Sequence, residues 1–109
     1  MKVATAKEVL VAAKWLLNHY DWTRLTMWRD KKGQDIGTER LILDGTRKLG
    51  SCCLLGAISL VECTPQAKVD THQIVKLATH APYISTWNDD PGRTKQDVIA
   101  LLDKLIAKA

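Results

Sequence analysis

The segment from Cys52 to Glu62 is apolar on nearly every side of a helix drawn through it. A helix of this kind lies in the interior of a protein, because any side left in water would expose apolar surface. Its small residues, Gly56, Ala57 and Ser59, allow neighbouring elements to approach closely. A chain of 109 residues holds one core. The segment therefore predicts a buried central helix, with Ser51 as its cap.

Three further helices are predicted to surround the central one. Each begins at a side chain whose oxygen can accept a free amide of the first turn, and each carries apolar residues at helical spacing. Proline residues separate them, since proline cannot continue a helix. The predicted limits are Thr5 to Tyr20, with a capping box of Thr5 and Glu8; Asp70 or Thr71 to His80, separated from the central helix by Pro65 and stopped by Pro82; and Thr94 to Lys108.

Residues 21–50 follow a different pattern. Apolar and polar residues alternate from Leu25 to Ile36 on either side of a turn at Asp30–Gly33, which is typical of a β-hairpin. A further short strand is predicted at Arg40–Leu43. The fold class is therefore mainly α. It is a small single domain, residues 1–109, of about four helices around a buried central helix, with one short β-hairpin.

The first helix carries a second apolar patch besides its core stripe. Trp15 lies about 160° from the centre of that stripe, and Val11 and Ala12 lie beside it. A patch of this kind calls for a cover. The favoured cover is the hairpin of residues 22–36, because a short chain needs its apolar surface for its own core. The alternative is the same patch on a second copy, in a two-fold homodimer.

Composition and charge limit the compartment and the partners. The hydrophobic and charged fractions, 46% and 26%, exclude a disordered tail or a coiled coil. The net charge of +4 permits an anionic ligand without requiring nucleic acid. No secretory signal is evident, and the longest uncharged run, Leu49–Val61, is too short to span a membrane. An odd number of cysteines, three, indicates reduced thiols. We expect a cytoplasmic protein without membrane contact.

No catalytic or metal-binding set is recognisable. The spacing of the cysteines and histidines matches no common zinc pattern. Burial in an apolar helix makes Cys53 a poor nucleophile, and we expect Cys53→Ser to cost about 1–3 kcal/mol through an unpaired hydroxyl. We therefore predict no enzymatic activity, no metal and no cofactor. The residues considered for metal binding are Cys52, Cys53, Cys63, His72 and His80.

The loop from Trp87 to Thr94 carries the predicted ligand site. Arg93 stands at the start of the last helix, where free amides attract negative charge, and its planar guanidinium suits a phosphate. An aromatic ring beside it suits a base. The alternative is that Asn88 and Asp89 merely shape a turn. The predicted ligand-binding residues are Trp87, Asn88, Asp89, Gly92, Arg93, Thr94 and, from the hairpin, Trp28 and Arg29.

Two stretches resemble a small family of unknown function from bacteria and their phages. The first runs from Ile84 through Trp87-Asn-Asp-x-Pro-Gly-Arg-Thr94 to Asp103. The second is Cys53-Leu-Leu-Gly-Ala57. Family members often have a Trp before this cysteine, where this chain has Cys52. The resemblance implies a shared fold and a phage or mobile-element context, and it implies no particular activity.

The predicted function is a non-enzymatic, phage-derived binding protein for a nucleotide-like or other phosphate-bearing ligand. Sequestration of a nucleotide signal of host defence, an immune-evasion role, suits such a protein. One alternative is an interaction module that inhibits a host protein through the Trp15 patch. A second is a nucleic-acid-binding accessory protein, because Trp and basic residues interleave in residues 22–32. A polar cleft at Arg93 would favour the ligand-binding hypothesis. An Arg93 bonded within the chain, together with an exposed Trp15 patch, would favour the hypothesis of a protein partner.

Overall fold

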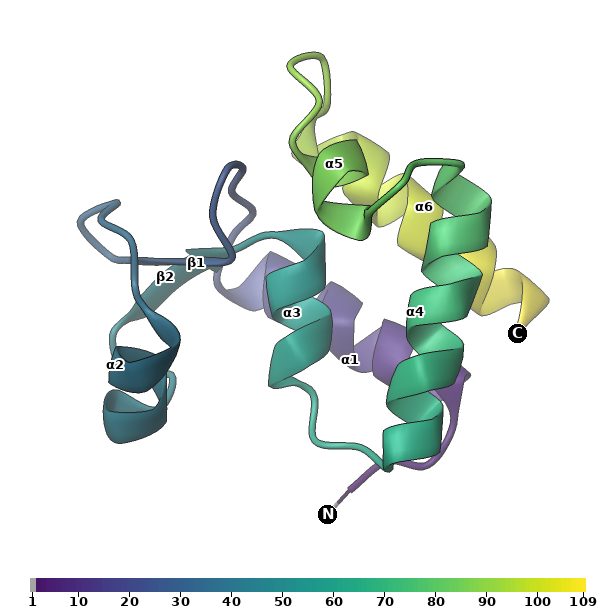
Figure 1. The fold of residues 1–109 in the computed structure, drawn as a ribbon, viewed down its shortest axis with the longest axis horizontal. Helices are drawn as coiled ribbons and strands as arrows, with labels where there is room; N and C mark the ends of the chain where they lie inside the picture. Colours follow the sequence, from purple (N-terminus) through teal and green to yellow (C-terminus); the bar gives the residue numbers. More distant parts are fainter. Residues whose placement is uncertain (1) are drawn as a thin grey trace.

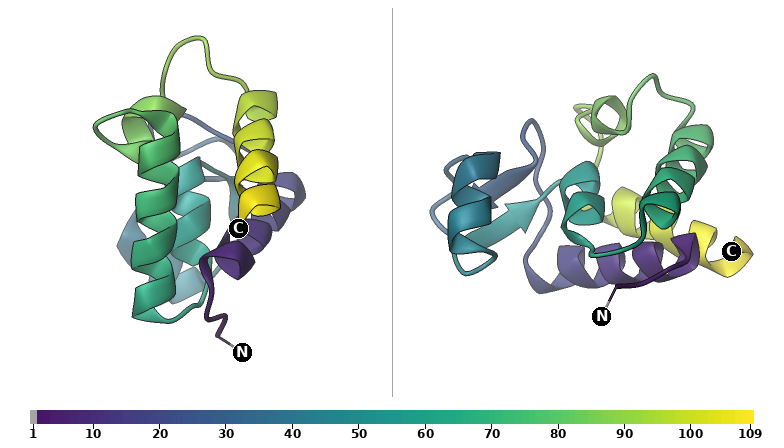
Figure 2. Two further views of the ribbon diagram at one scale, coloured as in Figure 1. Left: turned by 90° about the vertical axis from the view of Figure 1, so that its right-hand side faces the viewer. Right: turned by 60° about the horizontal axis from the view of Figure 1, so that its bottom comes forward.

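The computed structural model describes residues 2–109, and it confirms a mainly α fold (Figure 1). Helix α1 packs against α3, α4 and α6, and α5 packs against α3 and α4. The two strands and α2 form a lobe beside these helices (Figure 2). In chain order the elements are α1 (Ala6–His19), β1 (Trp28–Asp30), α2 (Thr38–Asp44), β2 (Leu49–Cys52), α3 (Leu54–Leu60), α4 (Pro65–Thr79), α5 (Ile84–Asn88) and α6 (Lys95–Lys108).

The first and last helices begin and end close to their predicted limits. The Thr5 hydroxyl accepts the Glu8 amide at 3.2 Å, and the Glu8 carboxylate accepts the Thr5 amide in return. Thr94 and Asp97 form the same reciprocal box at the start of α6. Each box satisfies amides that the first turn leaves free. The core stripe of α1 is fully buried, as its spacing predicted, at Val9, Leu10, Ala13 and Leu17.

Helix α3 is shorter than predicted and is not the hub of the fold. Ser51 does not cap it, because Ser51 and Cys52 belong to β2. The N-cap is Cys53, whose thiol sulfur accepts the Gly56 amide at 3.2 Å. The helix is buried as predicted, but α1 rather than α3 contacts the largest number of helices. Strand pairing of Cys52 leaves Cys53 as the first residue available to start a helix.

Helix α4 begins earlier than predicted. Pro65 is its first residue rather than a separator, and the Thr64 hydroxyl caps it by accepting the Ala67 amide at 3.2 Å. Proline suits this place because its missing amide would have no partner there. Thr71 lies inside the helix, where its hydroxyl donates to the Ala67 carbonyl at 2.7 Å. The predicted end is confirmed, since His80 is the C-cap in a left-handed conformation.

Two short helices replace a predicted strand and a predicted loop. Residues Arg40–Leu43 lie in α2, which is bounded by Gly37 and by Gly45 with φ of +61°. None of its residues is buried. The spacing of its apolar residues therefore does not indicate a buried helix face, and the helix could not be predicted from it. Helix α5 is little more than one turn, and its two buried residues, Ile84 and Asn88, lie four apart on one face. Patterns of four or five residues do not separate helix from strand.

The predicted turn is present, and the predicted hairpin is confirmed in part: Arg29 bridges Asp35 antiparallel across the turn, and the Ile36 amide donates to the Trp28 carbonyl at 2.9 Å. The Asp30 carboxylate accepts the Lys32 and Gln34 amides, each at 2.9 Å. Strand β1, however, pairs antiparallel with β2, with Trp28 opposite Cys52. The Trp28 indole is 7% exposed and donates to the Gly56 carbonyl at 3.2 Å. Strand β2 leads into α3, so this pairing brings the Trp28 indole against Gly56.

The predicted cover of the Trp15 patch is wrong. Val11 and Trp15 remain 48% and 59% exposed, so neither strand nor α2 covers them. Trp15 stacks on His19 with ring centroids 4.5 Å apart. A hollow of about 320 Å³ adjoins the ring. It is lined by Val3, Ala12, Trp15, Leu16, Val61 and Glu62.

Within residues 2–109, no helix is long and apolar enough to cross a membrane. The same residues bring together no group of three or more histidine, cysteine and acidic side chains suited to a metal ion.

Candidate functional site: the Trp87–Thr94 loop and a basic hollow

Asn88, a predicted ligand residue, is fully buried and bonded within the chain. Its Oδ1 accepts the Trp22 indole N–H at 2.7 Å and the Leu54 amide at 3.0 Å. Its Nδ2 donates to the Thr23 carbonyl at 3.1 Å and to the Asp89 carboxylate at 3.0 Å. Both polar atoms of the Asn88 side chain thus make two hydrogen bonds each to other groups of the chain. Asn88 therefore fastens α5 to the start of α3 and to the chain before β1.

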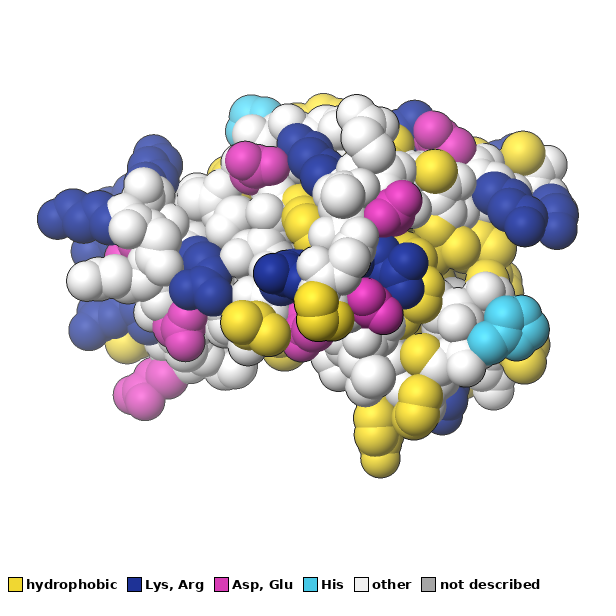
Figure 3. Space-filling model, turned by 90° about the horizontal axis from the view of Figure 1, so that it is seen from above, with side chains coloured by type: hydrophobic (Ala, Val, Ile, Leu, Met, Phe, Trp, Pro, Cys, Tyr) yellow, Lys and Arg dark blue, Asp and Glu magenta, His cyan; other side chains and the backbone are white. Residues whose placement is uncertain are grey.

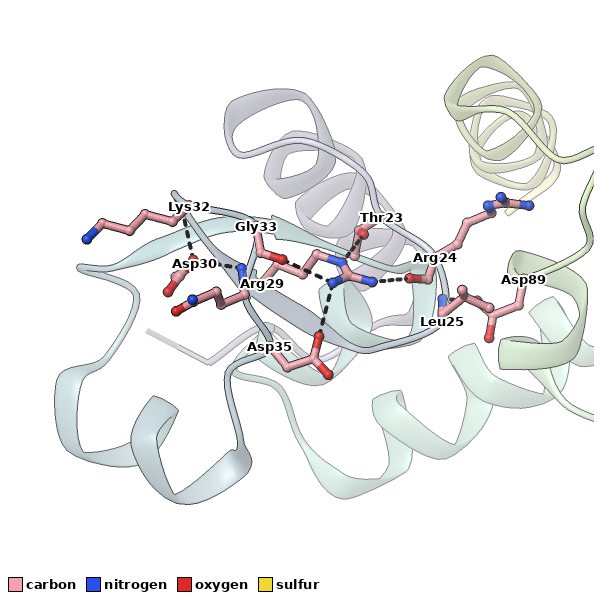
Figure 4. A network of polar contacts seen from close by, with 10 residues as sticks. Thr23, Arg24, Leu25, Arg29, Asp30, Lys32, Gly33, Asp35 and Asp89 are labelled. Atoms are coloured by element: carbon pink, nitrogen blue, oxygen red, sulfur yellow. Dashed lines mark hydrogen bonds and ion pairs between the residues drawn. The ribbon is translucent and has the colours of Figure 1, made fainter.

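Asp89 and Asp90 also bond to the chain before β1, at Leu25 and Arg24. The Asp89 carboxylate accepts the Leu25 amide at 2.8 Å (Figure 4). The Arg24 guanidinium donates to the Asp90 carbonyl at 3.0 Å. Leu25 adopts a φ of +73°, a strained conformation for a side chain of its size. These contacts hold the strained residue in place.

Arg93 lies over Trp87 rather than over open solvent. Its Nε donates to the Trp87 carbonyl at 2.9 Å, and its guanidinium carbon lies 3.9 Å from the centre of the Trp87 ring. This cation–π contact covers one face of the Trp87 ring. Gly92 donates its amide to Asp90, and Thr94 is engaged in the helix cap. The loop residues are thus together in space, and the side chains of Asn88 and Asp89 and the Nε of Arg93 are bonded within the chain.

The two predicted site residues from the strand region lie apart from this loop. Trp28 sits in the core, as described above, and has no open face for stacking. Arg29 donates to the Thr23 hydroxyl, to the carbonyls of Arg24 and Gly33, and to the Asp35 carboxylate (Figure 4). With four hydrogen-bond partners within the chain, Arg29 holds the segment before β1 to the turn that follows it.

A second set of cations converges at the strand pair. Two basic pairs, sixteen positions apart in sequence, flank the strands: one follows β1 and the other precedes β2. Antiparallel pairing places them side by side around a hollow of about 310 Å³, which we name the basic hollow. Lys and Arg side chains gather over this end of the molecule (Figure 3). The hollow is lined by Lys31, Lys32, Arg47, Lys48, Asp30 and Gln34.

The basic hollow has an excess of positive charge. In the part of the chain that the structure describes, Lys31, Lys32 and Arg47 form no ion pair. Its one carboxylate, Asp30, already accepts two backbone amides. The sequence shows both basic runs, but it gives no sign that they meet. The two runs could have been predicted to meet only if the pairing of β1 with β2 had been known.

An adjoining hollow lies between the turn and α2, and we name it the α2 hollow. Its volume is about 430 Å³, and it shares Asp30 and Lys48 with the basic hollow. The Asp44 side chain in its wall is 16% exposed. Its remaining lining residues are Asp35, Ile36, Gly37, Arg40 and Gly45.

The buried thiols are not suited to catalysis. Burial raises the pKa of Cys52 to about 12, and burial also raises the pKa of Cys53. Both side chains are almost fully buried, while Cys63 is half-buried. The predicted penalty for Cys53→Ser loses its reason, because the position accepts the Gly56 amide and a hydroxyl would do the same.

We expect alkaline pH to destabilise the fold through Cys52. The unfolded chain releases this proton near pH 9, while the native state holds it to about pH 12. The contribution of Cys52 to the free energy of unfolding is therefore fully present below about pH 9 and falls as the pH rises from about 9 to about 12. Urea unfolding across this range measures the slope, which should be shallower in Cys52→Ala than in the parent. Equal slopes in the two proteins would contradict the assignment.

Comparison with known proteins gives a family for nearly the whole chain. The model of a family of unknown function, DUF6197, matches residues 1–108. No curated protein and no solved structure matches the chain. Since the match spans the helices, both strands and the loop described above, the protein belongs to DUF6197, a family of unknown function.

Proposed function

We propose that the protein is a non-enzymatic binding protein for a phosphate-bearing ligand, and that the phosphate binds in the basic hollow. The observation that carries this proposal is the convergence of four cations on one hollow, three of them without an ion pair within residues 2–109. Concentrated charge of one sign in a concave surface attracts the opposite charge. Arg47 supplies a planar fork for two phosphate oxygens, and the lysines supply point charges.

The proposal moves the phosphate away from the Trp87–Thr94 loop. Arg93 covers Trp87, and Asn88 and Asp89 are bonded to the chain. In the basic hollow Lys31 and Lys32 have no such competing partner among the described residues, and Lys48 alone of its lysines pairs with a carboxylate, Asp44. Phage origin and sequestration of a nucleotide signal of host defence belong to the same proposal, because a non-enzymatic binding protein would act on such a signal by holding it.

We expect Lys31→Gln/Arg47→Gln to weaken binding of inorganic triphosphate by about tenfold or more, since two cations leave the hollow. Isothermal titration at low salt measures the affinity, and salt should weaken it in the parent protein. The control is Lys104→Gln/Lys108→Gln, which removes the same charge from exposed positions on α6. Equal affinity in both variants would contradict the site, and absence of binding by the parent protein would contradict the function.

A single-stranded oligonucleotide serves as a further probe in the same titration. If it binds much more tightly than triphosphate and loses affinity in Lys31→Gln/Arg47→Gln, the protein is a nucleic-acid-binding accessory protein instead. The affinity for the oligonucleotide should then fall steeply with salt, because binding to a nucleic-acid backbone releases counterions.

The open Trp15 patch supports a second candidate, an interaction module. With the intramolecular cover eliminated, the predicted occupants that remain are the same patch on a second copy and a host protein; we take the second copy first, since it can be tested with this chain alone. Sedimentation over a range of concentrations should show a dimer that Trp15→Ala dissociates while the monomer stays folded. Leu77→Ala, at a 74% exposed position on α4, should leave the dimer intact. A parent protein that remains monomeric throughout would exclude the second copy.

A further inference from the structure

We infer that the ligand of the basic hollow carries hydrogen-bond donors next to its phosphate, as the sugar of a ribonucleotide does, and that Asp44 in the α2 hollow accepts them. The inference rests on the proposed function, since it places the phosphate in the basic hollow. It narrows the ligand class from any phosphate compound to one with a hydroxylated group attached.

The first support is the arrangement of the two hollows. Asp30 and Lys48 line both of them, so the hollows lie side by side. One is lined mainly by cations; the other has three carboxylates against two cations, Arg40 and Lys48, with an apolar residue, Ile36, in the wall. A ligand with an anionic end and an uncharged, donor-rich end matches this division.

The second support is a shielded acceptor that receives no hydrogen bond. Asp44 Oδ2 is shielded from solvent and has no hydrogen-bond partner in the structure of residues 2–109. Arg40 Nη1 and Lys48 Nζ form ion pairs with it at 3.9 Å and 3.8 Å, but these distances are too long for hydrogen bonds. A buried acceptor without a donor is costly. A ligand hydroxyl would supply the missing donor.

The third support is the position of Lys48, which connects the two hollows. Its ammonium neighbours Asp44, and the same side chain lines the basic hollow. A phosphate bound there competes with Asp44 for Lys48. Lys48 and Arg40 are more than 60% exposed, so both can turn away without breaking core contacts. Binding of the phosphate thus uncovers the carboxylate for the rest of the ligand.

The test compares inorganic triphosphate with ATP on three proteins by isothermal titration. The parent should bind ATP about tenfold more tightly than triphosphate. In Asp44→Ala the two ligands should bind equally, and triphosphate should bind more tightly than it does to the parent, because a negative charge beside Lys48 is gone. The control Glu39→Ala removes an exposed carboxylate from the same helix and should keep the preference for ATP.

The outcomes separate this inference from the proposed function. Equal affinities of the parent for the two probes, or an unchanged ATP preference in Asp44→Ala, would overturn the role of Asp44 and leave phosphate binding standing. If neither probe binds the parent protein, the proposed function fails, and this inference fails with it.

Discussion

Asn88→Ala is expected to lower the free energy of unfolding by about 3–5 kcal/mol, the largest stability change that we predict. The substitution leaves the Trp22 indole N–H, the Leu54 amide and the Thr23 carbonyl without their partner. Since Asn88 is fully buried, water does not replace the lost amide without a local opening. Each unsatisfied buried group adds about 1–3 kcal/mol of desolvation cost.

Urea unfolding followed by tryptophan fluorescence measures this loss. The matched control is Asn18→Ala, which changes the same residue type at an exposed position on α1 and should alter stability by less than about 0.5 kcal/mol. A variant at position 88 that unfolds at nearly the parent urea concentration would show that the loop does not hold α5, α3 and the chain before β1 together. It would then reopen Asn88 as a ligand residue.

Gly56→Ala is expected to destabilise the protein by about 2–3 kcal/mol, as overpacking of a core does. A methyl group at this position would overlap the Met27 carbonyl oxygen and crowd the Trp28 indole nitrogen at 3.1 Å. The sign of the effect is informative, because alanine is by itself favoured over glycine in a helix by roughly 1 kcal/mol. A loss therefore reports the close approach of the chain before β1 to α3.

Ser59→Ala provides the control in the same helix. Ser59 is exposed, so alanine there should leave stability unchanged or raise it slightly through helix propensity. The same unfolding measurement applies to both variants. If alanine at position 56 stabilised the protein as alanine at position 59 does, Met27 and Trp28 would not contact α3 as closely as the structure shows.

The start of the outer helices could be predicted because the determinants are local. Thr5 with Glu8, and Thr94 with Asp97, satisfy their own first turns within three residues. The apolar stripe of α1 reports a face that is buried in any packing arrangement. The starts of α3 and α4 were predicted wrongly, since Ser51, Asp70 and Thr71 are good capping residues that the structure uses elsewhere.

The loop from Trp87 to Thr94 could be singled out from sequence, but not interpreted. Its residues suit both phosphate binding and turn formation, and the choice depends on what lies opposite. The structure places the Trp22 indole and the Leu54 amide against Asn88. Those partners lie 66 and 34 positions away along the chain, so no local pattern reveals them.

Local sequence patterns are sufficient to predict the mainly α class, the capping boxes of the outer helices, the buried stripe of α1 and the turn at Asp30–Gly33. The pairing of β1 with β2, the helical state of residues 40–43 and the meeting of two basic runs at one hollow depend on contacts between distant parts of the chain. Caps and stripes are set by neighbours within four positions. Strand partners are set by which pairing buries Trp28 beneath α3, and the hollow is a consequence of that pairing.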